Sequence, residues 1–390
     1  MIFSIAIILL SGIIAGRLAE KAGLPSLLGM ILAGIAIGPF CLNIVDSRLL
    51  DISRQLRTIA LIIILARAGL SLDMKVLRRL GRPALLMCFL PACTEIAAMA
   101  LLAPIFFDIS ALDGAIIGTI TAAVSPAVIV PKMIKLNSEG AGVQKGIPQL
   151  ILAGASVDDV IVIVLFSAFA SLSAGGSFSL SRFARIPPAI FIGLLAGLAA
   201  GYIIGRCLTF FTLNKPVQII LPLCAAFILY SAEDFLSAFI PFSGLIAVMA
   251  MGLVLQKSRP EKLPLLSGAW ADIWALAQIV LFVLVGTAVN LPYAMGAGIS
   301  AVVLILLILP IRCIGVQACL VGTDLNFKER LFVSLAYLPK ATVQAAMSAV
   351  PLAMGLSCGS LALTMAVLAI LITAPLGAFL IDKFYKKLLY

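Results

Sequence analysis

Residues 153–164 read Ala-Gly-Ala-Ser-Val-Asp-Asp-Val-Ile-Val-Ile-Val and place two adjacent carboxylates, Asp158 and Asp159, inside an apolar run that extends from Ile147 to Ser173. A run of that length can cross a bilayer as one helix, because about 20 apolar residues suffice. An ionisable side chain at bilayer depth costs about 2.5–3.5 kcal/mol even on the mildest insertion scale, so a neighbouring pair needs a partner or a function. This stretch predicts a buried, charge-bearing membrane helix.

The rest of the chain has the composition of a membrane protein. Of its 390 residues, 63% are hydrophobic and only 11% are charged, whereas soluble domains have about 25% charged residues. We predict an all-α polytopic membrane protein in which residues 1–390 form a single integral membrane unit. A span of about 20 apolar residues per crossing predicts thirteen helices, in the ranges 1–16, 24–40, 56–72, 83–107, 112–134, 147–173, 186–211, 216–232, 241–256, 268–289, 292–320, 331–352 and 357–382.

Charge and residue usage restrict the function. The net charge of +10 comes from Lys and Arg gathered in alternate connections, which the positive-inside rule explains without a nucleic-acid partner and which predicts the N-terminus outside and the C-terminus inside. The chain has no histidine, and its eight cysteines form no Cys-x-x-Cys motif. Common catalytic triads and metal motifs are therefore missing, and we expect neither an enzyme nor a cofactor.

Five charged side chains remain deep inside the predicted spans once the connections are set aside, together with Arg67 and Asp272, which are expected near the inner ends of their spans. At 1.5 Å per residue, Glu95, Asp158, Arg312 and Lys340 lie about 12–18 Å from the inner ends of their helices, close to the centre of the apolar core. Asp159 is the fifth member of this set. Three acids against two bases at one depth predict a shared polar interior.

Two predicted spans are interrupted at that same depth. The fifth contains Thr121-Ala-Ala-Val-Ser-Pro126, and the twelfth contains Tyr337-Leu-Pro-Lys-Ala-Thr342. A proline inside a helix removes a backbone donor and disfavours helix in the preceding residue, so each span is predicted to be two half-helices. The two spans have opposite predicted orientations, which favours an inverted repeat with two crossed, broken helices, as in transporters.

These residues can bind a hard cation and a proton in competition. Na⁺ or Li⁺ prefers oxygen ligands, which Asp159, Asp158, backbone carbonyls freed before Pro126 and the hydroxyls of Ser125, Thr121 and Ser156 can supply. Each hydroxyl can equally bond only its own helix. Lys340 can pair with Asp158, while Glu95 and Arg312 are interpreted as a structural ion pair.

The motifs themselves resemble a known family. The Val-Asp-Asp of 157–159, the Val-Ser-Pro-Ala of 124–127 and above all the Leu-Pro-Lys-Ala-Thr-Val-Gln-Ala-Ala of 338–346 are similar to sodium/proton antiporters of the cation:proton antiporter superfamily, nearest to the NapA-like bacterial proteins and the NHA branch. The resemblance implies an NhaA/NapA-like fold and a homodimer. It also implies a core domain from 83–173 and 292–382 and a dimerisation or scaffold domain mainly from 1–72 and 186–289.

The resemblance further implies individual roles. Asp159 is expected to be the principal cation and proton carrier, with Asp158 as a second carboxylate that is bridged to Lys340 when no cation is bound. Glu95 and Arg312 match a buried acid and base that brace the core domain. The electroneutral branch typically has Thr-Asp-Pro and Asn-Asp where this chain has Val-Ser-Pro and Asp-Asp, which favours electrogenic exchange.

We therefore expect a secondary active Na⁺(Li⁺)/H⁺ antiporter that works by alternating access in a bacterial cytoplasmic membrane and serves pH homeostasis. Its expected partners are a monovalent cation, a proton, the lipid bilayer and a second copy of the chain. Three alternatives stay open: a K⁺/H⁺ antiporter of the same fold, a sodium-coupled solute symporter, and a membrane sensor that binds a cation without turnover.

Overall fold

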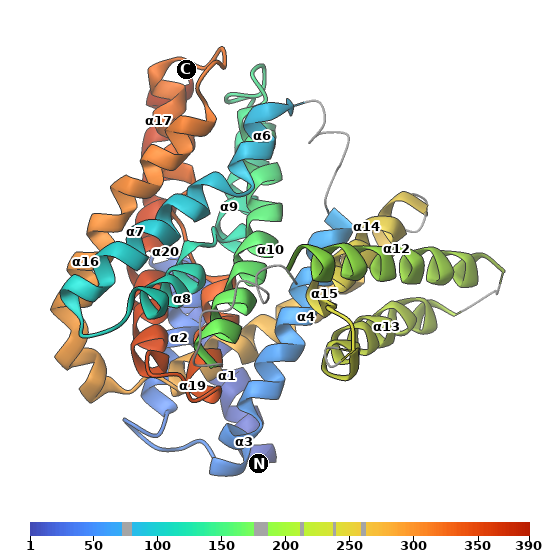
Figure 1. Ribbon diagram of the computed structural model, residues 1–390, viewed down its shortest axis with the longest axis horizontal. Helices are drawn as coiled ribbons and strands as arrows, with labels where there is room; N and C mark the ends of the chain where they lie inside the picture. Colours follow the sequence, from blue (N-terminus) through green and yellow to red (C-terminus); the bar gives the residue numbers. More distant parts are fainter. Residues whose placement is uncertain (72–79, 175–185, 211–213, 237–238, 259–262) are drawn as a thin grey trace. The chain divides into compact units, whose positions relative to one another are not determined.

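The computed structural model describes residues 1–71, 80–174, 186–210, 214–236, 239–258 and 263–390, and the regular structure in these ranges is entirely helical (Figure 1). The helices are α1 (Ile2–Lys21), α2 (Ser26–Ile37), α3 (Ser47–Asp51), α4 (Ser53–Ser71), α6 (Arg82–Met87), α7 (Leu90–Phe106), α8 (Ala111–Ala122), α9 (Pro126–Ser138), α10 (Ile147–Ala174), α12 (Ile186–Phe210), α13 (Lys215–Leu236), α14 (Gly244–Ser258), α15 (Leu263–Thr287), α16 (Leu291–Cys319), α17 (Phe327–Ala336), α18 (Thr342–Met347), α19 (Val350–Ala353) and α20 (Gly359–Leu389).

Each of the thirteen predicted spans overlaps one, two or, for 331–352, three of these helices. Within the described ranges, nine helical segments are long and apolar enough to cross a membrane, and three shorter apolar helices accompany them, at Ser26–Ile37, Gly244–Lys257 and Thr342–Ala353. The multi-pass organisation thus follows from length and composition. The total of thirteen crossings and the side of the membrane that each terminus faces stay predictions.

The contacts divide the chain into two compact units. The first contains residues 1–54, 73–176 and 281–390, and the second contains residues 55–72 and 177–280. Both predicted core ranges, 83–173 and 292–382, lie in the first unit, as does most of the N-terminal range that we predicted as scaffold. The assignment of transport and dimerisation to particular ranges stays a prediction.

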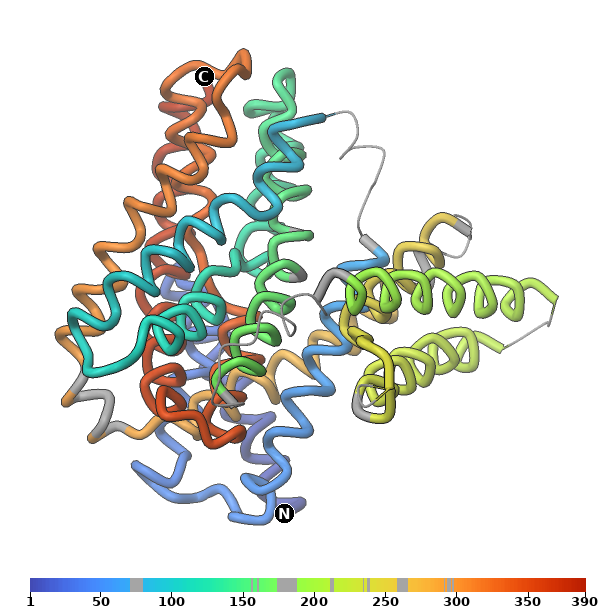
Figure 2. The backbone as a smooth tube through the Cα atoms, in the orientation of Figure 1, coloured from blue at the N-terminus to red at the C-terminus, as the bar shows by residue number. Residues whose placement is uncertain are grey.

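Glycines allow the helices of the second unit to approach closely. A Cβ atom on Gly193, Gly197 or Gly201 of α12 would lie 2.2–2.7 Å from a carbonyl oxygen of the Ser243–Met251 stretch. Contacts of this kind stabilise helix pairs in lipid, where apolar surface alone gives no preference for protein over lipid tails. The yellow-green tube of Figure 2 shows α12 beside α13, which belongs to the same unit.

Gly197→Ala is expected to destabilise the protein by about 1–3 kcal/mol because the added methyl group overlaps a backbone atom that cannot rotate away. The Cβ position at Gly197 lies 2.2 Å from the Ala247 carbonyl oxygen. The matched control is Gly268→Ala in α15, where a Cβ meets no atom within 4 Å and where alanine favours the helix. Thermal unfolding in detergent measures both, and equal melting temperatures for the two variants would contradict the packing argument.

Local sequence determines where helix α8 of the first unit begins and ends. Helix α8 starts at a capping box in which Ser110 Oγ accepts from the Asp113 amide at 3.1 Å and Asp113 Oδ2 accepts from the Ser110 amide at 3.2 Å. It ends at Ala122, because the chain becomes extended at Ala123 (ψ 139°) before Pro126 opens α9. The predicted interruption of the fifth span is therefore present, and it spans residues 123–125.

The second interruption lies between α17 and α18. Helix α17 ends at Ala336, the chain passes through Pro339, and α18 begins at Thr342. Helix α20 supports this segment: a Cβ on Gly377 would lie 2.3 Å from the Pro339 ring, so only glycine permits the observed approach.

The structure also interrupts a span that we predicted as continuous. Residues 83–107 form two helices, α6 and α7, which are separated at Cys88 and Phe89. Pro91, in the first turn of α7, has no amide hydrogen to continue the ladder from α6. The sequence thus contained the signal, since a proline in the first turn commonly marks a helix start.

Candidate ion-binding site

The interruption after α8 leaves backbone carbonyls without a partner inside a helix, and such groups are costly to bury unless they accept hydrogen bonds from elsewhere. The Thr121 carbonyl accepts from Lys340 Nζ, and the Ala122 carbonyl accepts from Arg312 Nη1. The Ala123 carbonyl accepts from Gln344 Nε2 at 2.7 Å. Each of these three carbonyls, which lie in the segment before Pro126, thus accepts a hydrogen bond from a side-chain donor.

Asp158 and Asp159 lie on α10 beside this segment, with exposed fractions of 0% and 3%. Asp158 Oδ2 accepts from the Val124 amide at 2.9 Å and contacts Arg312 Nη2 at 3.3 Å. The other oxygen of Asp158 and the Oδ1 atom of Asp159 are buried and have no hydrogen-bond partner among the described residues. Two carboxylate oxygens are therefore available to a ligand.

Arg312 connects most of the buried charges. Its Nη1 donates to Glu95 Oε2 at 2.8 Å, its Nε donates to the Tyr337 carbonyl at 2.8 Å, and its Nη2 reaches Asp158. The guanidinium is fully buried and uses the planar fork that distinguishes arginine from lysine. It binds groups from four elements and holds α16 against both interruptions.

Lys340 has a different partner from the expected one. The resemblance implied a bridge to Asp158, but Lys340 Nζ contacts Glu95 Oε1 and the Thr121 carbonyl. Asp158 pairs instead with Arg312, through Oδ2, which also accepts from the Val124 amide. Glu95 thus pairs with both buried bases and does more than brace Arg312.

The two interruptions meet directly. The Ser125 amide donates to the Pro339 carbonyl at 2.8 Å, and the Lys340 amide donates to Thr373 Oγ1 of α20 at 3.0 Å. A single cluster therefore contains both non-helical segments, the buried charges and α20.

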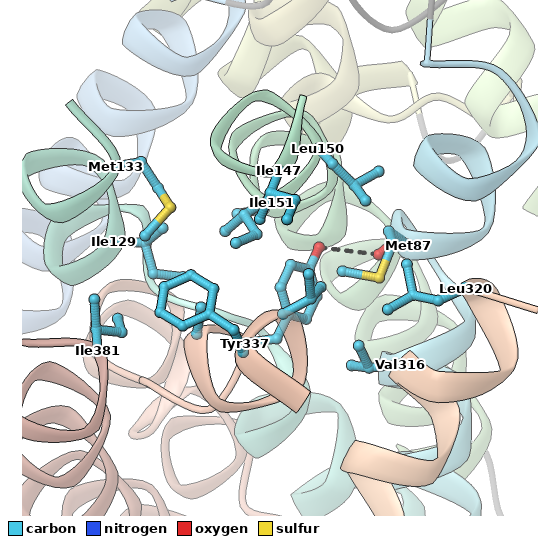
Figure 3. Packing of buried hydrophobic residues seen from close by; sticks show 14 of the residues in the cluster. Met87, Ile129, Met133, Ile147, Leu150, Ile151, Val316, Leu320, Tyr337 and Ile381 are labelled. Carbon is cyan, nitrogen blue, oxygen red and sulfur yellow. Dashed lines mark hydrogen bonds between the residues drawn. The ribbon is translucent and has the colours of Figure 1, made fainter. Parts of the chain in front are cut away.

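Tyr337, at the end of α17, ties this cluster to the interruption before α7. Its hydroxyl donates to the Met87 carbonyl at 3.0 Å, as Figure 3 shows. Gly154 makes room for the ring, because a Cβ there would lie 2.4 Å from the Tyr337 hydroxyl oxygen. The carbonyl freed at the end of α6 is thereby satisfied inside the protein.

The three hydroxyls that we predicted as ligands differ in their hydrogen bonding. Ser125 Oγ is fully buried and has no hydrogen-bond partner in the described parts of the chain. Thr121 Oγ1 instead bonds the Ile117 and Gly118 carbonyls at 3.1 and 3.3 Å, within its own helix. Ser156 belongs to α10, but its side chain lies outside the described residues.

Among the described residues, the cluster contains three buried acids, Glu95, Asp158 and Asp159, and two buried bases, Arg312 and Lys340, so one net negative charge remains when all are ionised. A buried net charge is costly, and either a proton or a monovalent cation can neutralise it. Within the described residues, no group of three or more His, Cys, Asp or Glu side chains could hold a metal ion. A cation bound at the aspartates would need hydroxyl, amide or water oxygens as well.

Sequence reasoning missed Gln344 and Tyr337 as members of this site. Both lie in the 337–346 stretch around the second interruption, and both are fully buried. A glutamine inside an apolar span is itself a signal, because its amide needs partners there.

Comparisons with known proteins agree with this architecture. A family model described as "Sodium/hydrogen exchanger, transmembrane" matches residues 5–385. Sodium/hydrogen exchanger 9B2 of Homo sapiens is 33% identical over 420 residues, covering 100% of this chain and 75% of the relative. Sodium/hydrogen exchanger 9B1 of Homo sapiens is 32% identical over 416 residues, covering 100% and 78%.

The fold is also similar to a solved one. The structure of the sodium proton antiporter MjNhaP1 from Methanocaldococcus jannaschii at pH 8 superposes with a TM-score of 0.88 at 23% identity, covering 100% of this chain and 98% of that chain. An all-helical, multi-pass arrangement with charged side chains buried around interrupted helices is typical of membrane transporters. This chain belongs to the sodium/hydrogen exchanger family. The predicted superfamily, the all-α polytopic fold and the transporter class, as opposed to an enzyme, are confirmed.

Proposed function

We propose that this protein exchanges Na⁺ or Li⁺ for H⁺ by alternating access, with cation and proton competing for the Asp158–Asp159 pair. The observation that carries the proposal is a pair of buried carboxylate oxygens, Asp158 Oδ1 and Asp159 Oδ1, that accept no bond from any described residue and lie in a cluster with one excess negative charge. Binding of either ligand neutralises that charge, so the two ligands exclude each other. Family membership supports sodium/proton exchange in general.

Each residue has a proposed role. Asp159 is the principal carrier, because neither Arg312 nor Lys340 bonds it. Asp158 is the second carboxylate, and Ser125 supplies a hydroxyl ligand, since its Oγ is buried without a partner among the described residues. Lys340 acts through Glu95 and the Thr121 carbonyl, and Arg312 with Glu95 fixes the two interruptions. Thr121 and Ser156 stay secondary ligand candidates.

Stoichiometry, assembly and location complete the proposal. Two carboxylates in one site suit electrogenic exchange, in which the second carboxylate binds a further proton beyond the one that neutralises the excess charge, so that more than one proton moves per cation. Residues 83–173 and 292–382 are proposed as the transporting core, and 1–72 and 186–289 as the region of a homodimer contact. A role in pH homeostasis and a bacterial cytoplasmic membrane location follow from the likeness to NapA-like bacterial proteins.

Purified protein in sealed liposomes with an imposed pH gradient tests the proposal. Addition of Na⁺ or Li⁺ is expected to collapse the gradient. In Na⁺-loaded liposomes a membrane potential that is negative inside is expected to accelerate proton entry if exchange is electrogenic. A response to K⁺ alone would assign a K⁺/H⁺ antiporter, and sodium uptake coupled to a solute without proton counterflow would assign a symporter. Cation binding without any flux would assign a sensor.

A further inference from the structure

The end of α8 is held by one neutral side chain in addition to the charged ones. The last carbonyls of a helix have no donor within it. Gln344 Nε2 donates to the Ala123 carbonyl at 2.7 Å and lies 3.3 Å from the Thr121 carbonyl. Gln344 is fully buried, and its Oε1 has no partner among the described residues. Its amide is therefore used mainly as a donor to this interruption.

The Ala123 carbonyl belongs to a peptide unit that also contacts the aspartate pair. The peptide bond is planar, so the carbonyl of Ala123 and the amide of Val124 turn together. That amide donates to Asp158 Oδ2 at 2.9 Å. A side chain that fixes the Ala123 carbonyl thus fixes the donor that orients the Asp158 carboxylate. The orientation in turn decides where Asp158 Oδ1, the oxygen without a donor, is presented.

We propose that Gln344 is a positioning residue for cation binding. It holds the peptide unit of residues 123 and 124 so that Asp158 and the adjacent Ser125 present their free oxygens to one ligand. This inference rests on the proposed exchange function at the aspartate pair. It assigns Gln344 to cation binding and not to the movement that exposes the site, because the two hydrogen bonds from its Nε2 both go to the segment that carries the Val124 amide.

Gln344→Met tests the proposal, since methionine has a similar length but no donor. The Na⁺ concentration for half-maximal exchange is expected to rise about 5- to 10-fold, with the maximal rate changed by less than about twofold. A tenfold change corresponds to about 1.4 kcal/mol, which is within the range for one neutral hydrogen bond. The rise in melting temperature that Na⁺ causes in detergent is expected to need correspondingly more Na⁺.

Gln317→Met is the matched control. Gln317 of α16 also donates through Nε2, to Ser334 Oγ at 2.8 Å and to the Arg330 carbonyl at 3.1 Å. Its partners belong to α17 and not to the interruption after α8, so its loss is expected to leave the half-maximal Na⁺ concentration unchanged. Gln344→Asn keeps the amide but shortens its reach, and we expect an increase of about threefold or more.

The outcomes separate this inference from the function on which it rests. If wild type exchanges Na⁺ and Gln344→Met does so with an unchanged half-maximal concentration, or with only a lower maximal rate, Gln344 has no positioning role and the exchange function stands. If wild type neither exchanges nor binds Na⁺ or Li⁺, the proposed function itself fails. Should Gln344→Met not fold, wild-type affinity in Gln344→Asn would overturn the inference.

Discussion

Asp159→Asn is expected to abolish cation-driven proton movement in liposomes and to leave a folded protein. An amide carries no negative charge for a cation and no proton that it can exchange. Removing one charge about 4 Å from a monovalent cation costs about 4 kcal/mol at an effective dielectric constant of about 20, so cation affinity should fall on the order of a thousandfold. The melting temperature should stay at or above that of wild type, because a buried carboxylate without a bonded base is replaced by a neutral group of the same shape.

The measurement compares wild type, Asp159→Asn and a control in which an exposed aspartate is changed. Asp272 of α15 is exposed, and Asp272→Asn is expected to exchange at the wild-type rate. Thermal unfolding with and without Na⁺ adds a binding readout that does not depend on transport. Exchange by Asp159→Asn within a few-fold of wild type would remove Asp159 from the carrier role.

Arg312→Met is expected to cause a larger loss of stability than any other substitution proposed for this protein. Loss of the guanidinium leaves Glu95 paired with Lys340 alone and takes away the charged partner of Asp158. It also removes the donor to the carbonyls of Ala122 and Tyr337. Breaking a buried ion pair by removing one partner typically costs about 3–5 kcal/mol. Arg312→Lys should cost less, but lysine cannot reproduce the fork that reaches four groups.

Arg330→Met is the control, because it removes an arginine that does not belong to the buried charged cluster. Arg330 is only partly buried and donates to the Leu325 and Thr323 carbonyls at 2.8 and 3.1 Å, both of which are neutral. We expect its replacement to cost about 1 kcal/mol. Unfolding in detergent with increasing denaturant compares the two, and a loss for Arg312→Met no larger than that for Arg330→Met would show that the buried network is not held by its guanidinium.

The members of the charged cluster could be predicted from the sequence because membrane burial makes polar residues conspicuous. Five charges and two proline interruptions at one depth are visible without any three-dimensional information, and the structure places these elements in contact. Pairing was harder to predict. The positions of Glu95 and Asp158 in the sequence allow either of them to pair with Lys340, and only the three-dimensional arrangement of the side chains shows that Glu95 is the partner.

Other features were missed for local reasons. The division of the fourth span at Cys88 and Phe89 was overlooked because apolar residues continue across it, although Pro91 signals a new helix start. Gln344 received no role, since its function depends on a peptide unit more than 200 residues away in the chain. The side-chain donors to the carbonyls of residues 121–123 were also missed, although buried backbone groups need partners whether or not a cation is bound.

The hydrogen bond from the Ser125 amide to the Pro339 carbonyl has a mechanical consequence. An interrupted helix can bend where its regular hydrogen bonding stops, and two interruptions that are not in contact could bend independently. Here the 2.8 Å bond joins the two interruptions. Lys340 and Gln344, from the second interruption and the helix after it, also donate to the Thr121 and Ala123 carbonyls at the first. The two interruptions are therefore expected to move together, so that a displacement of residues 123–125 also displaces residues 337–341.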